Sequence, residues 1–354
     1  MALPEEIGTE MGGRNFMNMQ TVRSQLQVRT RGSLGMRVLV LVMAALASSC
    51  DRERDVEIPV RLSSGPTIGL SDTTGSDSLT APEEVLRFAY ANVLSPERSA
   101  LAYAELAGYL TAKLGRPVEI LRRRTYAELN SLLQNGTAEA GIICTGAFAV
   151  AHEEFGLEAL VLPVVDGEIT YRSYVIARRG AGRDSFEDLR GVVFAFSDPL
   201  SNTGYRYVAA KLRARGTDAS AFFGRHFFTY SHDNAIQAVL DGIADAGSVD
   251  ALVWDQLIRL DPAVEAQLVI VDRSEEFPIN PVVVSPRISS NLRRALKAAL
   301  LEMADDPRGV VVLNDLGTDR FLEPTAATHA GYAAIAQSWR ELGVLGPELG
   351  AERH

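Results

Sequence analysis

The sequence predicts an α/β protein built from two lobes, and two observations support this. Short apolar segments alternate with amphipathic helical segments from Leu86 to about residue 342, the pattern of α/β layers with parallel strands. The segment 133–141 is also echoed about 106 residues later by 240–247. Each copy has the pattern of a helix end, a glycine cap and a turn into a buried strand. This echo favours two lobes of similar build, although chance is the alternative because glycine caps are common.

The individual elements follow from apolar spacing. Helices are expected where apolar residues recur every three or four positions, and the first of them should stop at Gly115. The expected helices are 98–114, 126–134, 204–215, 233–241, 289–304 and 327–342. The expected strands are 86–90, 118–121, 141–144, 159–163, 170–178, 192–196, 226–229, 248–254, 267–271 and 281–285.

Composition excludes several classes of protein. A chain of 354 residues is long enough for about two domains. Its net charge of −10 argues against a nucleic-acid partner. Two cysteines form neither a disulfide scaffold nor a four-cysteine zinc site, and Cys144, in an apolar strand, is expected to be inert core. We expect no cofactor and no metal.

The first 49 residues have the pattern of a signal peptide. An apolar run of ten residues, 38–47, follows Met36-Arg37 and precedes Ser48-Ser49-Cys50. Its length suits a signal peptide and is too short to span a bilayer. Small residues before a cysteine resemble a bacterial lipobox, although Ala47 stands where leucine is usual. We expect lipidation at Cys50, and the alternative is a short buried helix with a free cysteine.

Residues 50–84 are expected to form a flexible tether. The segment is rich in Ser, Thr, Gly, Asp and Pro, and it lacks a sustained apolar period. Residues 1–35 are unusually long for the start of a signal peptide, so translation starts either at Met1 or at Met36. The folded body is expected to begin near Leu86.

The common enzymatic fingerprints are absent. The chain has no Gly-Lys pair for a phosphate-binding loop and no G-x-S-x-G motif, and His152-Glu153-Glu154 lacks the second histidine of a zinc protease. The absence of these motifs argues against an enzyme.

The most informative stretch follows the expected strand 192–196. Ser201-Asn202-Thr203 precede Gly204 and a helix, so Ser201 can cap the helix. The first-turn N–H groups and the helix dipole then favour a negative ligand. Three hydrogen-bonding side chains in a row can serve several oxygens of a tetrahedral anion. The alternative is a plain helix cap after a loop.

This stretch resembles a loop of a known family. Asp198 to Gly204, Asp-Pro-Leu-Ser-Asn-Thr-Gly, is similar to the Asp-Pro-x-Ser-Thr-Ser-Gly loop of the phosphate-, phosphite- and phosphonate-binding proteins of ABC importers. The likeness extends over most of 86–340. Its further motifs are 106–118, Thr125-Tyr126-Ala127, Ser231-His232-Asp233 with 236–239, and Pro278-Ile279-Asn280-Pro281.

The resemblance implies a type II periplasmic-binding-protein fold. The first lobe would hold 86–172 and 273–354, and the second 173–272. Two crossover strands would form a hinge, with the ligand in the cleft between the lobes.

The resemblance also implies the binding residues. Ser201, Asn202 and Thr203 match the anion-gripping triplet, which has Ser-Thr-Ser in the family. Five further positions match residues near the ligand: Tyr126, Tyr171, His232, Asp250 and Asn280. Asp250 falls where aminophosphonate binders hold an ammonium group, whereas Asn280 is neutral where some of them have an acid. Because of these departures from the family pattern, a smaller oxyanion and a different phosphonate are both alternatives for the ligand.

The implied function is capture of a phosphate-, phosphite- or phosphonate-like oxyanion. The protein would be a monomer on the outer side of the cytoplasmic membrane, in contact with the membrane through its lipid anchor only. It would deliver the oxyanion to an ABC permease and its ATPase. The alternatives are a ligand-sensing partner of a membrane receptor or sensor kinase, a binder of an unrelated solute, and an enzyme on the same scaffold.

Overall fold

The computed structural model describes residues 85–91 and 96–343. The expected signal peptide, Cys50 and the tether lie outside the described residues. No helix within the described ranges is long and apolar enough to span a membrane.

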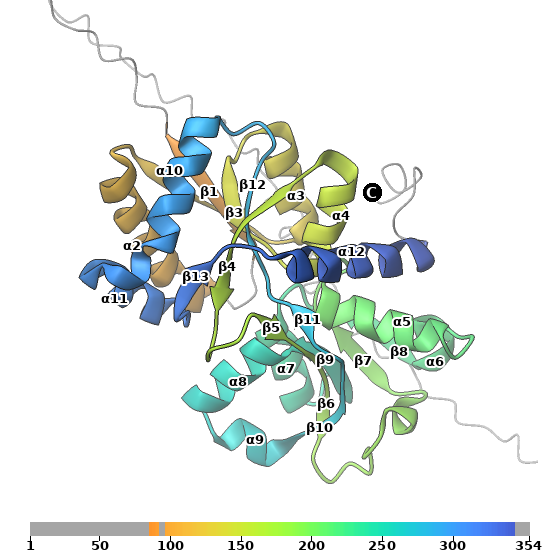
Figure 1. Cartoon of the computed structure of the whole chain (residues 1–354). Helices are drawn as coiled ribbons and strands as arrows, with labels where there is room; N and C mark the ends of the chain where they lie inside the picture. Colours follow the sequence, from red (N-terminus) through yellow and green to blue (C-terminus); the bar gives the residue numbers. More distant parts are fainter. Residues whose placement is uncertain (1–84, 92–95, 344–354) are drawn as a thin grey trace, which may run out of the picture. The chain divides into compact units, whose positions relative to one another are not determined.

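A six-stranded mixed sheet forms the centre of what we call the first lobe (Figure 1). Its strands, in sheet order, are β13(Arg320–Leu322), β4(Glu158–Val164), β12(Val282–Val284), β3(Ala140–Ile142), β1(Leu86–Ala91) and β2(Val118–Arg123). β1 pairs in parallel with β2 and β3, whereas β12 runs antiparallel between β3 and β4.

Helices cover both faces of this sheet. Successive side chains along each strand point to opposite faces, and both faces carry apolar residues that must be buried. Phe88 packs toward one core and Ala89 toward the other. The first face is covered by α2(Pro96–Leu114), α10(Ser290–Leu301), the short turn η3(Met303–Asp305) and α11(Pro307–Asp315). The second is covered by α3(Tyr126–Asn135), α4(Thr145–Phe155) and α12(Ala326–Glu341).

A five-stranded mixed sheet forms the centre of the second lobe. Its order is β10(Leu268–Arg273), β6(Ser173–Arg178), β9(Ala246–Asp250), β7(Val193–Phe196) and β8(Arg225–Phe228). One face packs on η1(Phe186–Leu189), the helical turn η2(Asn202–Arg206), α5(Tyr207–Arg213), α6(Ala219–Phe222) and α12. The other packs on α7(His232–Leu240), α8(Ala251–Leu260) and α9(Ala263–Gln267).

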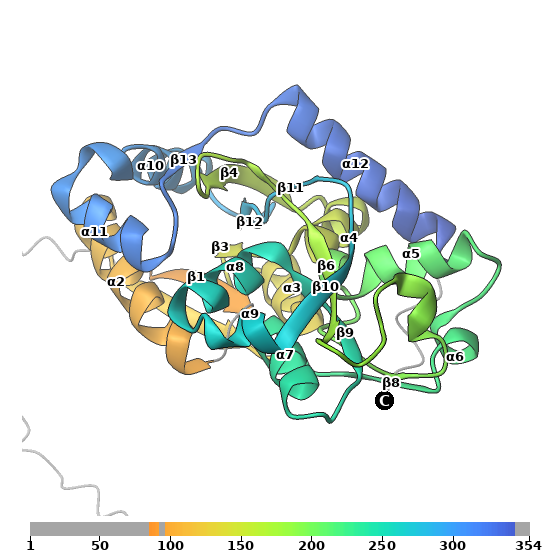
Figure 2. The ribbon, with the colours of Figure 1, turned by 90° about the horizontal axis from the view of Figure 1, so that it is seen from below.

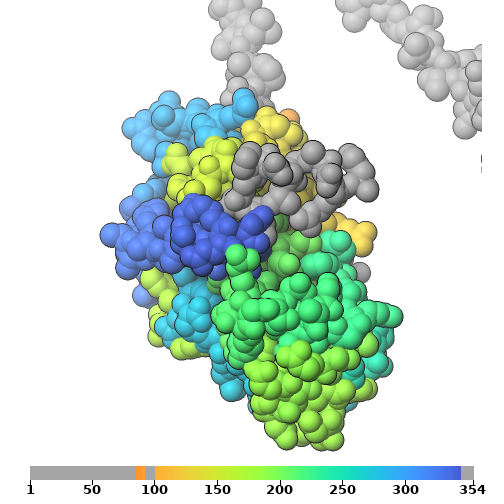
Figure 3. All heavy atoms as spheres, turned by 90° about the vertical axis from the view of Figure 1, so that its right-hand side faces the viewer, coloured from red at the N-terminus to blue at the C-terminus, as the bar shows by residue number. Residues whose placement is uncertain are grey.

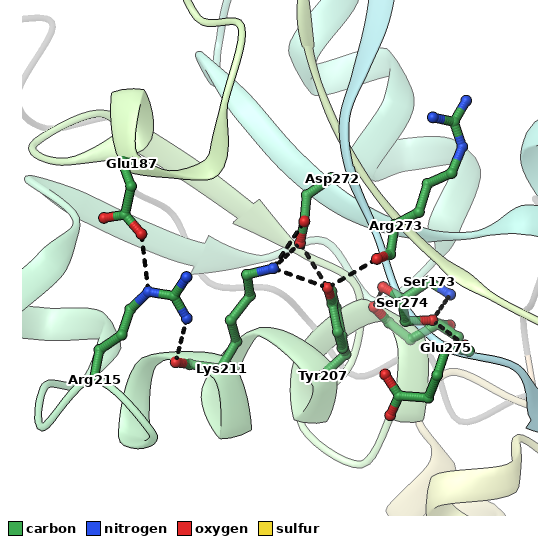
Figure 4. A network of polar contacts seen from close by, with 10 residues as sticks. Ser173, Glu187, Tyr207, Lys211, Arg215, Asp272, Arg273, Ser274 and Glu275 are labelled. Atoms are coloured by element: carbon green, nitrogen blue, oxygen red, sulfur yellow. Dashed lines mark hydrogen bonds and ion pairs between the residues drawn. The ribbon is translucent and has the colours of Figure 1, made fainter.

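Two chain crossings join the lobes as a short ribbon, β5(Thr170–Tyr171) paired antiparallel with β11(Phe277–Pro278). Figure 4 shows how the second crossing is fastened to α5. The Tyr207 hydroxyl donates to Asp272 Oδ2 at 2.6 Å, and Lys211 Nζ lies 2.7 and 2.6 Å from the two Asp272 oxygens. Ser274 Oγ accepts the Ser173 N–H at 2.8 Å and so ties the two crossings together. Helix α5 is thereby fastened to the end of β10, from which the chain continues to β11.

Helix α12 contacts both lobes. Figure 2 shows it beside α4 and α5, and Figure 3 shows it at the surface between the residues of the two lobes. Tyr332 packs edge-on against Phe148 of the first lobe, and its hydroxyl donates to Ile279 O at 2.7 Å. Trp339, fully buried, stacks on Tyr205 of the second lobe.

The expected alternation and the internal echo are confirmed, with corrections. Gly136 and Gly242 both adopt positive φ after a helix and lead into β3 and β9. The sheets are mixed rather than parallel, because β6 and β12 run against their neighbours where the chain changes lobe. The strand expected at 248–254 ends at Asp250, and α8 begins at Ala251. The strand expected at 170–178 is interrupted at Arg172, which separates β5 from β6. The elements that were not predicted include α4, α6, α9, α11, β11 and β13.

Candidate functional site

The predicted anion-binding segment lies at the end of β7, and we call Asp198–Gly204 the cradle loop. Ser201 has extended backbone angles and caps the helical segment 202–213, with Gly204 N–H donating to Ser201 Oγ at 2.9 Å. The first turn is π-helical, so Arg206 N–H reaches Ser201 O at 3.0 Å. Such wide turns recur at functional sites. Ser201, Asn202 and Thr203 are all fully buried.

His232 fixes the direction of the Ser201 hydroxyl. Its Nδ1 accepts the Asp250 N–H at 3.0 Å, so the neutral ring carries its proton on Nε2, 3.5 Å from Ser201 Oγ. Burial lowers the pKa of His232 to about 4, which keeps the ring neutral. Gly204, His232 and the Cys144 S–H group, whose sulfur is 3.9 Å away, all donate toward Ser201 Oγ, so its own proton is left to donate to a further group.

Among the buried polar atoms that have no hydrogen-bond partner in the described residues, Ser197 Oγ lies beside Gly204, and two more belong to predicted site residues. These two are Thr203 Oγ1 and Asp250 Oδ2. Asp250 caps α8 with its other oxygen, which accepts the Leu252 N–H at 2.8 Å. Burial raises the pKa of Asp250 to about 7, partly offset by the nearby Asn280 side chain. Buried polar atoms are normally paired, so these two are expected to face a ligand.

The first lobe supplies the opposite wall. Tyr126 begins α3, and its N–H donates across the lobes to Asp198 Oδ2 at 3.2 Å. Burial raises the pKa of Asp198 to about 6. Asn280 Oδ1 accepts from the N–H and the hydroxyl of Thr145, at 2.9 and 3.0 Å, which leaves its NH₂ group free to face Asp250.

Tyr171 joins the site from the ribbon. Its hydroxyl accepts from Asn202 Nδ2 at 3.4 Å, and the ring is 3% exposed. The negative charge of Asp250 helps to raise the pKa of both Tyr126 and Tyr171, although burial is the largest cause. All eight predicted residues therefore gather around one region between the lobes. Whether each contacts a ligand stays a prediction.

The lobes meet at a glycine. A Cβ on Gly146 would lie 2.5 Å from Leu200 O and 2.7 Å from Asn202 N, closer than any side chain allows. Beside it, Cys144 is the first residue before α4, and its Sγ accepts the Asn202 N–H at 3.4 Å. Cys144 is buried in the core as expected, and burial raises the pKa of its thiol, while its sulfur also contacts the cradle loop.

Arg206 is a second residue that the sequence did not predict. It is 5% exposed, donates from Nε to Asn202 Oδ1 at 2.5 Å and from a terminal nitrogen to Ser338 Oγ at 2.6 Å. No described carboxylate lies within ion-pair distance of it. Because guanidinium only donates, Asn202 must turn its oxygen to Arg206 and its NH₂ group to Tyr171. The four-residue spacing of Asn202 and Arg206 is the signal that could have paired them.

Among residues 85–91 and 96–343, no cluster of three His, Cys, Asp or Glu side chains is arranged to hold a metal ion. The site is built from hydroxyl, amide, imidazole, carboxyl, guanidinium and thiol groups. Its chemistry suits hydrogen bonding to a small ligand.

Solved structures share the fold at low sequence identity. PhnD1 from Prochlorococcus marinus, in complex with methylphosphonate, is 17% identical with a TM-score of 0.67; the match covers 75% of this chain and all of that chain. A binding-protein component of an ABC phosphonate transporter from Pseudomonas aeruginosa is 21% identical with a TM-score of 0.68, over 76% and 91%. XAC2383 from Xanthomonas citri, bound to chloride ion, is 20% identical with a TM-score of 0.63, over 73% and 98%.

These neighbours are periplasmic binding proteins of the type II fold, so the fold class expected from the sequence is confirmed. The family model for the ABC transporter, phosphonate, periplasmic substrate-binding protein matches residues 88–329, more than half of the chain. The chain therefore belongs to the family of periplasmic substrate-binding proteins of phosphonate ABC transporters.

Proposed function

We propose that the protein captures a phosphate-, phosphite- or phosphonate-like oxyanion between its lobes. The family supports capture of a solute for an ABC importer. We infer the class of ligand from the buried first turn of the helical segment 202–213. There the Ser201 hydroxyl is directed away from its donors, and Thr203 Oγ1 has no partner among the described residues. A dry site with fixed donors discriminates by leaving its groups unpaired when the wrong ligand binds.

The ligand would be held between Ser201, Asn202 and Thr203 on one side and Tyr126 and Tyr171 on the other. His232 would act indirectly, because its Nε2–H orients Ser201. The free oxygen of Asp250 would accept a hydrogen bond from a donor on the ligand, such as the ammonium group of an aminoalkyl phosphonate.

The lobes would open and close about the β5–β11 ribbon. In this proposal the first lobe holds 86–172 and 273–354, and the second holds 173–272. Hydrogen bonds across the lobes, from Tyr126 to Asp198 and from Asn202 to Cys144, would form on closure.

The cellular setting follows from the predicted signal peptide. The protein would be anchored by a lipid on Cys50 outside the cytoplasmic membrane, work as a monomer and pass its ligand to a permease and its ATPase. Metabolic labelling with a fatty-acid analogue tests the anchor, because a Cys50→Ser variant should lose the label.

A thermal-shift screen tests the ligand class. The purified protein is heated with phosphate, phosphite, methylphosphonate, aminoethylphosphonate, sulfate or amino acids. A ligand at 100 times its Kd adds about 2.7 kcal/mol of stability, a clear rise in Tm. Ser201→Ala should abolish the rise, whereas Ser131→Ala, on the exposed face of α3, should leave it intact. A rise with an unrelated solute alone would contradict the proposal.

A further inference from the structure

The Cys144 sulfur lies at a point where two helices begin. Cys144 directly precedes α4, and its Sγ accepts the N–H of Asn202, the first residue of the helical segment 202–213, at 3.4 Å. The Gly146 N–H in the first turn of α4 lies close enough to the sulfur to offset part of the burial that raises the pKa of the thiol. Ser201 Oγ lies 3.9 Å away. Backbone donors from both lobes therefore converge on a single side-chain atom.

These are the donors that an oxyanion oxygen would use. N–H groups at the start of a helix have no partner within the helix and bind anions readily. Here two of them lie close to a sulfur atom, which is a weak acceptor, and the S–H group is a weak donor. One corner of the site thus presents a soft, polarizable surface instead of a strong hydrogen-bonding group.

The other corners remain suited to oxygens. The Ser201 proton is directed away from Gly204 and His232, and Thr203 Oγ1 is fully buried without a partner among the described residues. Asp250 Oδ2, likewise unpartnered, lies close enough to Cys144 for its charge to act on the thiol. The unpartnered carboxyl group of Asp250 therefore lies near the sulfur, and the unpartnered Thr203 side chain directly follows Asn202, whose N–H bonds to the sulfur, so both support a ligand at this point.

We infer that Cys144 is a specificity-determining residue of this site, selecting anions with three oxygens and one non-oxygen substituent over anions with four oxygens. The inference rests on the proposed oxyanion function. The P–C or P–H substituent of a phosphonate or phosphite lies against the sulfur, where no hydrogen bond is lost. The fourth oxygen of phosphate or sulfate at this corner would lose its water and gain only a weak partner.

The test is a comparison of Kd values for methylphosphonate and phosphate, measured by calorimetry on the native chain and on Cys144→Ser and Cys144→Ala variants. Serine replaces the thiol with a stronger hydrogen-bond donor, and alanine uncovers the Asn202 and Gly146 N–H groups. Both changes should strengthen the binding of phosphate, because its fourth oxygen would gain a hydrogen-bond donor at this position. The native chain should bind methylphosphonate more tightly, and each variant should reduce its preference about tenfold, the effect of one hydrogen bond to a charged oxygen.

Ser285→Ala is the matched control. Ser285 is also buried in the first lobe, but it lies at the opposite end of β3, where its hydroxyl donates to Leu133 O at 2.7 Å. This variant should lower stability and leave the preference unchanged. The inference is overturned if the native chain shows no preference for methylphosphonate, or if both cysteine variants keep it. Failure of the proposed function has a different signature, since the native chain would then bind neither anion.

Discussion

Gly146→Ala tests whether close approach of the lobes is required for capture. The added Cβ would lie 2.5 Å from Leu200 O, whereas an ordinary contact begins near 3.4 Å, so the lobes must separate by about 0.9 Å. The atoms in its way are backbone atoms, which cannot rotate aside. Overpacking of this kind costs about 1–3 kcal/mol. The cost falls on the closed arrangement, because Gly146 and Leu200 belong to different lobes.

The expected result separates affinity from stability. The Kd for the captured anion should rise about 5- to 150-fold, the equivalent of that cost. The Tm without ligand should stay constant or rise slightly, because opening at the ribbon relieves the contact and alanine favours the helix by about 0.5–1 kcal/mol. Isothermal titration calorimetry and differential scanning calorimetry measure the two quantities.

Gly108→Ala provides the matched control. Gly108 lies within α2, and a Cβ there meets no atom within 4 Å. This variant should raise the Tm and leave the Kd unchanged. A Kd for Gly146→Ala within about twofold of the native value, well below the tenfold that 1.4 kcal/mol represents, would refute the reasoning.

Two further predictions concern buried charges. The pKa of Asp250 is raised from 3.8 to about 7, so the folded chain holds a proton that the unfolded chain releases, and stability falls as pH rises through this window. The Tm advantage of Asp250→Asn over the native chain should therefore grow between about pH 4 and pH 7 and then level off; an advantage that is constant with pH would contradict this. Arg206→Lys should cost about 1–3 kcal/mol in urea unfolding, because one ammonium group cannot reach both Asn202 and Ser338. An unchanged urea midpoint would show that the two hydrogen bonds contribute little.

Local sequence pattern predicted an element correctly where its signals all pointed to the same structure. The helix expected at 126–134, with its stop at Asn135-Gly136, is confirmed as Tyr126–Asn135, and the structure adds the Thr125 cap. The strand expected at 248–254 failed because Ala251 to Trp254 is an apolar run that suits a buried strand or a buried helix equally. The deciding feature is the Asp250 side chain, which caps α8. α4 was missed for a related reason, since seven of its eleven residues are buried, and its first turns lack a polar face.

The candidate site was likewise predictable from the sequence only in part. The cradle loop could be located because it lies between an apolar strand and a helix start, whereas His232 and Asp250 were implied only by the resemblance to the family. Cys144 could not be assigned a role, because its contact with Asn202 joins residues 58 positions apart in different lobes. No local spacing encodes such a contact. It depends on how the lobes pack, so the sequence predicted that Cys144 is buried but not its contact with the cradle loop.

The place of β12 in the first sheet has a consequence for folding. Val282–Val284 lies between β3 and β4, so the strand that closes the middle of the sheet follows its partner Ile142 by about 140 residues. Such distant pairing is slow, because the intervening chain must lose its freedom before the contact forms. A growing chain therefore holds an incomplete first sheet until the second lobe has been synthesised. An exported protein benefits from this delay, since a chain that has not yet folded can still pass through a membrane channel.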